Sequence, residues 1–211
     1  PVIGALAASL VIPGMAVGLM QAARNLERGQ PVGLQTLYGG LRENTRTLLI
    51  LGALYLCATL GVLTISTLVD GGDLFRYMLA SSRAERIAVE DADFVLPALV
   101  VMALLLPIMM AYWFAPVLAA WHRLPVGKSL FFSFMACLMN WRPFLIYSLG
   151  ILLIAGVLPG ILLGILLVVL PGAAGMATGL VMLPMGLIIA PVVFASFYAS
   201  YRDIFGISEI V

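Results

Sequence analysis

The residues best suited to catalysis or metal binding are few and scattered along this chain. It has one histidine, His122, and two cysteines, Cys57 and Cys137. A metal centre needs several His, Cys or carboxylate side chains close together, and a nucleophile needs a base within reach. Spacing singles out no such group, even with Asp203 added. We therefore expect a non-enzymatic protein with no cofactor, no metal and no disulfide.

One short motif resembles part of a nucleotide-binding loop. Gly127-Lys128-Ser129 matches the end of the P-loop pattern, which also needs a preceding strand and a glycine at the position of His122. A membrane helix is expected there instead, and His122 is expected to anchor the interface. Nucleotide and nucleic acid binding are therefore not expected.

Charged residues are scarce in this sequence. Of 211 residues, 63% are hydrophobic and 10% are charged, whereas soluble domains average about 25% charged residues. A soluble fold of this length could not shield so much apolar surface from water. The sequence therefore predicts an integral membrane protein.

The charged residues are also bunched, which leaves four charge-free stretches. These are Pro1–Ala23, Thr47–Val69, Phe94–His122 and Pro143–Tyr201. A spanning helix needs about 20 mainly apolar residues, so the first three stretches hold one helix each and the last holds two. The proline and glycines of Pro171–Gly175 mark the turn between these two. We expect an all-α bundle, one transmembrane domain over 1–211, with spans at about 1–20, 47–69, 94–120, 144–170 and 176–200.

Lysine and arginine gather on one side of the predicted membrane. Eight lie after the first, third and fifth spans, whereas three, accompanied by six acids, lie in loop 70–93. Basic loops stay in the cytoplasm, so the C-terminus is expected inside and loop 70–93 outside. Ser82 and Glu85 have capping-box spacing, which predicts a small surface helix in that loop. A solvated connection is favoured there over a docking site.

Two parts of the chain can be aligned with each other. The recurring motifs are Pro31-Val32-Gly33 with Pro125-Val126-Gly127, and Asn44-Thr45-Arg46 with Asn140-Trp141-Arg142. They predict tandem repeats, each a cytoplasmic interfacial helix followed by two spans, at 31–124 and 125–206, with a partial unit at 1–30. The alternative is chance recurrence beside the interface. With the repeat, a half-unit of about 45–50 residues would precede the partial unit and give six spans.

The two cytoplasmic connectors are expected to meet lipid. In the second, Ser129, Ser133, Ala136 and Asn140 form a narrow polar stripe that would face water while the apolar remainder enters the membrane. Packing of these helices against the spans is the alternative, and both can hold. The candidate headgroup-binding residues are Arg24, Arg46, Arg123, Lys128, Arg142 and Arg202.

Glycines spaced four apart are the strongest motif, and their role is structural. They are Gly14 and Gly18, then Gly156, Gly160 and Gly164, then Gly175 and Gly179. Such faces let helix backbones approach closely. Packing within the chain is favoured over a homodimer seam, and the oligomeric state stays open.

The spans contain no ionisable residue, which disfavours proton-coupled transport. Hydroxyl groups such as those of Tyr55, Tyr147 and Thr64 could line a weakly polar path, although bonding to a neighbouring helix or their own backbone is more common.

The C-terminal half resembles a known family. Tyr112-Trp113-Phe114-Ala115-Pro116, Asn140-Trp141-Arg142-Pro143-Phe144 and Ala199-Ser200-Tyr201-Arg202-Asp203 are similar to segments of an uncharacterised family of proteobacterial inner-membrane proteins. The resemblance implies six spans in a bacterial inner membrane, with loop 70–93 in the periplasm, and supplies no catalytic residue.

Two functions fit these features. The first is a non-enzymatic membrane protein that binds lipids or serves as a subunit or assembly partner of a larger membrane complex, as the interfacial helices and glycine faces suggest. The second is a carrier or facilitator for a lipid-like or small neutral solute, as repeats and kinked spans suggest.

Overall fold

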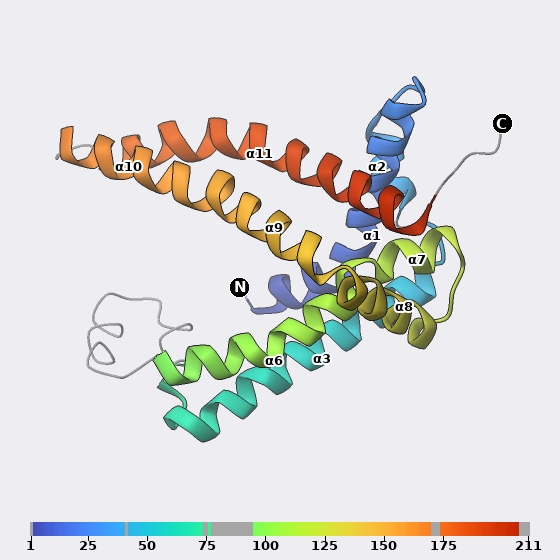
Figure 1. Cartoon of the computed structure of the whole chain (residues 1–211), viewed down its shortest axis with the longest axis horizontal. Helices are drawn as coiled ribbons and strands as arrows, with labels where there is room; N and C mark the ends of the chain where they lie inside the picture. Colours follow the sequence, from blue (N-terminus) through green and yellow to red (C-terminus); the bar gives the residue numbers. More distant parts are fainter. Residues whose placement is uncertain (1, 41, 74–75, 77–94, 170–173, 207–211) are drawn as a thin grey trace. The chain divides into compact units, whose positions relative to one another are not determined.

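The part of the chain that the computed structural model describes consists of helices and the short connections between them. This part comprises the backbone of residues 2–40, 42–73, 76, 95–169 and 174–206, and their side chains except those of 2–9 and 174–177. The helices are α1 (Val2–Glu27), α2 (Leu34–Gly39), α3 (Thr45–Asp70), α6 (Val95–Trp113), α7 (Ala115–Trp121), α8 (Val126–Met139), α9 (Trp141–Ile151), α10 (Leu158–Val169) and α11 (Ala174–Phe205), with a π-helical segment, η1 (Leu152–Val157), between α9 and α10 (Figure 1). An all-α membrane fold is thereby confirmed.

Four of the predicted spans are long and apolar enough to cross a membrane. Among the described residues these are Thr45–Asp70, Val95–Trp121, Trp141–Val169 and Thr178–Phe205. Helix α1, with 26 residues, remains a predicted fifth span. The predicted helix at Ser82 and the predicted turn at Pro171 lie outside the described residues.

The chain forms two compact units. The first comprises Pro1–Gly18 and Leu37–Met135, and the second comprises Leu19–Thr36 and Ala136–Val211. These units differ from the predicted repeats, which follow the order of helices along the chain. A short helix followed by two long ones does occur twice, as α2, α3 and α6–α7 and again as α8, α9–α10 and α11. The repeat itself stays a prediction.

In the first unit, α3 packs along α6 (Figure 1). The rings of Tyr55 and Tyr112 meet edge to face with centroids 5.1 Å apart, a favoured geometry for aromatic pairs. The Tyr55 hydroxyl donates to the sulfur of Met109 at 3.8 Å. Thr64 donates to the carbonyl of Leu60, in its own helix, at 2.8 Å. These hydroxyls therefore serve packing, as the common alternative predicts.

A buried serine spans the break between α6 and α7. Pro116 cannot donate a backbone hydrogen bond, and its ring disfavours a regular helix, so the helix is interrupted at Phe114. The backbone N–H of Phe114 donates to Ser133 Oγ at 2.8 Å, and Ser133 Oγ donates to the carbonyl of Met110 at 2.9 Å. Phe114 and Met110 are four residues apart, so this hydroxyl is inserted where a helical hydrogen bond would run.

In the second unit, the α9–α10 arm packs against α11 (Figure 1). Ser196 donates to the carbonyl of Val193 at 2.8 Å, so its hydroxyl accepts from Tyr147 on α9 at 2.9 Å. The arm becomes π-helical just before Pro159, and Leu158 N–H bonds back five residues to Leu153. This π segment was not predicted from the sequence.

The glycine faces behave differently from one another. A Cβ added to Gly18 would overlap the backbone of Leu37, and one added to Gly40 would overlap the backbone of Gly14 and Gly18. The backbone of residues 37–40 therefore approaches α1 closely at Gly14 and Gly18.

The glycine face of α10 is open in the described part of the chain, and its packing role stays a prediction. A Cβ at Gly160 or Gly164 would meet nothing within 4 Å, and one at Gly156 would meet only Leu152 of η1. Gly179 on α11 is equally open, and the side-chain surroundings of Gly175 lie outside the described part. The arm instead contacts α11 through other positions.

The side of α8 that was expected to face water is buried against the protein. Ser129 and Ser133 are completely buried, and Ala136 is nearly so, whereas Phe131, Leu138 and Met139 are exposed. The small residues let α8 pack closely on the protein, and its large apolar residues face outward. The prediction that the stripe faces water is wrong, and the alternative of packing against the spans holds.

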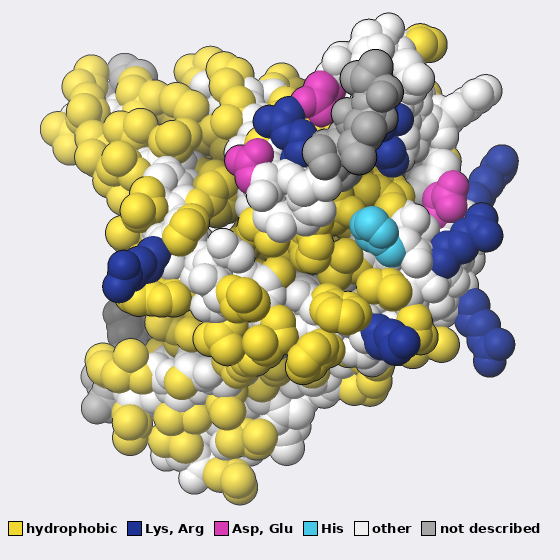
Figure 2. Space-filling view, turned by 45° about the vertical axis from the view of Figure 1, so that its right-hand side comes forward, with side chains coloured by type: hydrophobic (Ala, Val, Ile, Leu, Met, Phe, Trp, Pro, Cys, Tyr) yellow, Lys and Arg dark blue, Asp and Glu magenta, His cyan; other side chains and the backbone are white. Residues whose placement is uncertain are grey.

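Large apolar side chains are exposed along α3, α6, α9, α10 and α11. Figure 2 shows hydrophobic side chains over much of the visible face, with charged side chains confined to a few places. Such a surface is stable where lipid tails, not water, surround the helices.

Candidate functional site

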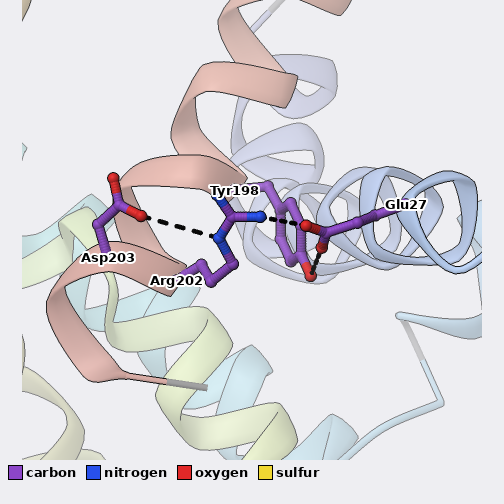
Figure 3. Close-up of polar contacts among 4 residues, drawn as sticks. All are labelled: Glu27, Tyr198, Arg202 and Asp203. Atoms are coloured by element: carbon purple, nitrogen blue, oxygen red, sulfur yellow. Dashed lines mark hydrogen bonds and ion pairs between the residues drawn. The ribbon is translucent and has the colours of Figure 1, made fainter. Parts of the chain in front are cut away.

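Two of the predicted headgroup-binding arginines lie where α1 and α11 end together. Glu27, the last residue of α1, accepts a hydrogen bond from the Tyr198 hydroxyl at 2.7 Å and forms an ion pair with Arg202. Figure 3 shows these side chains converging, with Asp203 on the far side of the guanidinium. Arg202 Nε lies 3.7 Å from Asp203 Oδ1. The ends of two helices distant in sequence are thereby joined.

Local backbone signals place these side chains. Gly29 has φ +66°, and the N–H of Gln30 bonds to the carbonyl of Asn25 at 2.8 Å, the pattern of a glycine-terminated helix. Gly206, with φ +56°, follows α11 in the same conformation. Tyr198 and Arg202 are four residues apart and share one face of α11, so both reach Glu27.

Basic side chains outnumber acids around this contact. Arg28 acts electrostatically on Glu27, and Arg24 lies within electrostatic range of the hydroxyls of Tyr198 and Tyr201. We name this group the α1–α11 cluster; its members are Arg24, Glu27, Arg28, Tyr198, Tyr201, Arg202 and Asp203. Three arginines face two carboxylates, so the cluster carries a net positive charge.

The Tyr198 hydrogen bond, followed by Arg202 and Arg28, holds the pKa of Glu27 below its ordinary 4.5. A lowered carboxyl pKa means that the contact stabilises the fold above about pH 4.5 and is lost as pH falls through the lower folded value. We expect ¹³C NMR of the Glu27 carboxyl to give a midpoint below 4.5. Tyr198→Phe should raise this midpoint, because it removes the largest cause. An unchanged midpoint in that variant would contradict the assignment.

Three other headgroup candidates belong to the first unit. The Asn44 amide donates to the carbonyl of Ala119 at 2.9 Å, which brings the start of α3 to the end of α7. Arg46 and Arg123 follow these two positions closely, and both are exposed, as is Lys128 at the start of α8. The start of α3, the end of α7 and the start of α8 thus carry a second group of basic residues.

Arg123 has an unusual backbone conformation. It directly follows the C-cap of α7 with φ +49°, in the left-handed region that glycine normally occupies at this position. A side chain with Cβ costs about 1–2 kcal/mol there. A strained residue that glycine could replace is a reason to look for a role of its side chain.

The sixth candidate, Arg142, lies near the start of α9. Its guanidinium carbon is 5.4 Å from the centroid of the Trp141 ring, and both side chains are exposed. The motif partners Asn44 and Asn140 differ in role, because Asn140 donates to the carbonyl of Ala136, four residues back, at 2.8 Å.

The groups first considered for catalysis or metal binding lie on several different helices. Among the described residues, no three His, Cys, Asp or Glu side chains gather as metal ligands would. His122 is the exposed C-cap residue of α7. Ser129 of the P-loop-like motif is completely buried and bonds to the carbonyls of Leu124 and Pro125.

Neither cysteine forms a disulfide. Cys137 is buried, and burial raises its pKa to about 12, so almost no reactive thiolate forms near neutral pH. In a Cys57→Ala chain at pH 7.5, we expect iodoacetamide to leave Cys137 unmodified over hours, as measured by mass spectrometry. Denaturation in SDS should restore labelling. Rapid labelling of the folded chain would refute the burial of this thiol.

The contacts of Glu27 and the bridging role of Ser133 were not predicted from the sequence. Glu27 is an acid directly after a predicted span among arginines, which is a signal that could have suggested a partner. Its partner Arg202 lies 175 residues away, and no spacing rule connects the two.

The helices and their basic ends define the class of this protein as a polytopic helical membrane protein. Residues 2–71 match a family described as "Predicted integral membrane protein (DUF2189)". The chain is 39% identical over 216 residues to a probable inner membrane protein of Burkholderia thailandensis, an alignment that covers 99% of this chain and 78% of that protein. No solved structure matches the chain.

The chain therefore belongs to this family of integral inner-membrane proteins. The family resemblance inferred from the C-terminal motifs is confirmed. The match at residues 2–71 adds the N-terminal third, which those motifs did not include.

Proposed function

We propose that this protein binds the headgroups of anionic phospholipids through the basic residues at its helix ends, without catalysing a reaction. The observation that carries this proposal is the gathering of exposed basic side chains at helix ends beside apolar, outward-facing helices. Arginine and lysine at such positions attract anionic lipid with about 1 kcal/mol each.

The first unit supports this function most directly. Arg46 and Arg123 are brought to one end by the bond between Asn44 and Ala119, and Lys128 follows Arg123 after five residues. The strained backbone of Arg123 is explained if its guanidinium has a ligand.

Passage of a solute is less well supported than binding. Two hydroxyls of the spans are engaged with protein groups, that of Tyr147 with Ser196 and that of Thr64 with its own backbone. The described spans therefore offer few polar groups to a moving solute.

Lipid retention tests the proposal. The chain is extracted from nanodiscs that hold equal amounts of phosphatidylglycerol and phosphatidylcholine, and bound lipid is identified by native mass spectrometry. We expect preferential retention of phosphatidylglycerol. The triple variant Arg46→Gln, Arg123→Gln, Lys128→Gln should reduce it by about tenfold or more.

A matched control removes three charges from the acidic loop 70–93. Arg76→Gln, Arg83→Gln and Arg86→Gln together change the net charge equally, and six acids in that loop oppose lipid binding. This control should leave retention nearly unchanged. Equal retention of both lipids by the wild-type chain, or equal loss in both triple variants, would refute the proposal.

A further inference from the structure

In the α1–α11 cluster, the Glu27 carboxylate occupies a position suited to a phosphate group. Its two oxygens accept from different donors, one from the Tyr198 hydroxyl at 2.7 Å and the other from the Arg202 guanidinium (Figure 3). Guanidinium and hydroxyl donors are used equally well by carboxylate and by phosphate oxygens. The donors therefore select an oxyanion but do not require that it be Glu27.

The site would retain donors and positive charge if Glu27 left. Arg28 acts electrostatically on the same carboxylate, and Arg24 acts on the neighbouring tyrosine hydroxyls. Asp203, at 3.7 Å from Arg202 Nε, balances only one of the three arginines. A vacant cluster would thus carry a charge of about +2 at neutral pH.

The contact is accessible from outside. The side chains of Arg202 and Glu27 are 44% and 40% exposed, so an incoming ligand can reach both. Exposed ion pairs contribute little to stability, so a phosphate with several charged donors can displace Glu27.

We propose that Glu27 is an internal competitor in a phosphate-binding site formed by Tyr198, Arg202, Arg24 and Arg28. The ligand is a phosphate group, carried by a lipid headgroup or by free phosphate, and it binds when Glu27 moves away from Arg202. The inference rests on the proposed function, because it uses the same ligand class. It concerns a different set of residues, and it predicts that removal of the Glu27 charge increases lipid retention.

Neutralising Glu27 is the decisive test. Glu27→Gln keeps a carbonyl oxygen for Tyr198 and Arg202 but loses the charge that competes with phosphate. Retention of phosphatidylglycerol, measured as above with the whole chain, should rise by about two- to fivefold. Glu43→Gln is the matched control. Glu43 is an exposed acid two residues before the start of α3, and it lies outside the cluster. A comparable rise in that variant would show a mere charge effect and overturn the proposal.

Two further variants test the donors. Tyr198→Phe and Arg202→Gln, each combined with Glu27→Gln, should cancel the gain. Unchanged or lower retention in folded Glu27→Gln, as judged by circular dichroism, would overturn binding of a lipid headgroup at this site and leave free phosphate as the ligand to be tested. Lipid preference that still depends on Arg46, Arg123 and Lys128 would then leave the proposed function standing.

The source of the phosphate is distinguished by a second measurement. Inorganic phosphate is added to Glu27→Gln in nanodiscs of phosphatidylcholine alone, and binding is followed by ³¹P NMR. Binding of free phosphate supports a soluble ligand, whereas a response to phosphatidylglycerol alone supports a lipid headgroup. A response to neither overturns the proposal.

Discussion

Gly18→Ala is expected to destabilise the protein by about 3 kcal/mol, at the upper end of the range for overpacking. The added Cβ would overlap the backbone carbonyl of Leu37. A flexible side chain could move aside, but a backbone carbonyl can do so only if the whole segment shifts. Gly40 approaches Gly18 from the same segment, so both contacts would open together. Unfolding in SDS, followed by circular dichroism, measures the change.

Gly61→Ala is the matched control for this substitution. Gly61 lies inside α3, and a Cβ there would meet nothing within 4 Å. Alanine is favoured over glycine in a helix by about 1 kcal/mol, so this variant should be as stable as the wild type or more so. Similar losses in both variants would show that the effect of Gly18→Ala does not arise from the close contact with Leu37.

The membrane class and most helix boundaries could be predicted because hydropathy and charge act locally. The third predicted span, 94–120, corresponds to the helical stretch Val95–Trp121, and its ends are marked by Asp93 and Arg123 in the sequence. The last span extends to Phe205, beyond the predicted residue 200, because charged residues such as Arg202 are compatible with a helix that leaves the membrane.

The direction in which a helix face points could not be predicted from composition. The stripe that contains Ser129 and Ser133 is polar enough to face water, but both residues are completely buried. In a membrane protein, small residues mark close helix contacts and large apolar residues can face lipid, which reverses the rule for soluble helices. The open face at Gly160 illustrates a related limit, because small residues permit contact but do not specify the partner.

The candidate site is formed by side chains that are distant in sequence, and local sequence patterns could not predict these pairs. Arg24 and Arg202 were both predicted to bind headgroups, but nothing in their spacing showed that Glu27 forms an ion pair with Arg202. An ion pair between residues 27 and 202 depends on how α1 and α11 end, and therefore on the tertiary fold.

Ser133→Ala is expected to destabilise the first unit by about 2–3 kcal/mol, because one substitution removes two hydrogen bonds in a buried place. The hydroxyl accepts from Phe114 N–H and donates to the Met110 carbonyl. Alanine fills nearly the same volume, so the loss reports the hydrogen bonds and not a cavity. The interrupted helix should also become more mobile, and faster amide hydrogen exchange at residues 113–115 would show it.

Ser129→Ala is the matched control for Ser133→Ala. Ser129 lies one turn earlier on α8 and is equally buried, but its hydroxyl bonds only to the carbonyls of Leu124 and Pro125. The Pro125 carbonyl already accepts the backbone N–H of Ser129 at 3.0 Å, so loss of this hydroxyl should cost less than about 1 kcal/mol. If both variants lost equal stability, burial of any serine on α8 would explain the effect. A larger loss in Ser133→Ala, with faster exchange confined to the α6–α7 break, would instead establish that the inserted hydroxyl holds the two helices together.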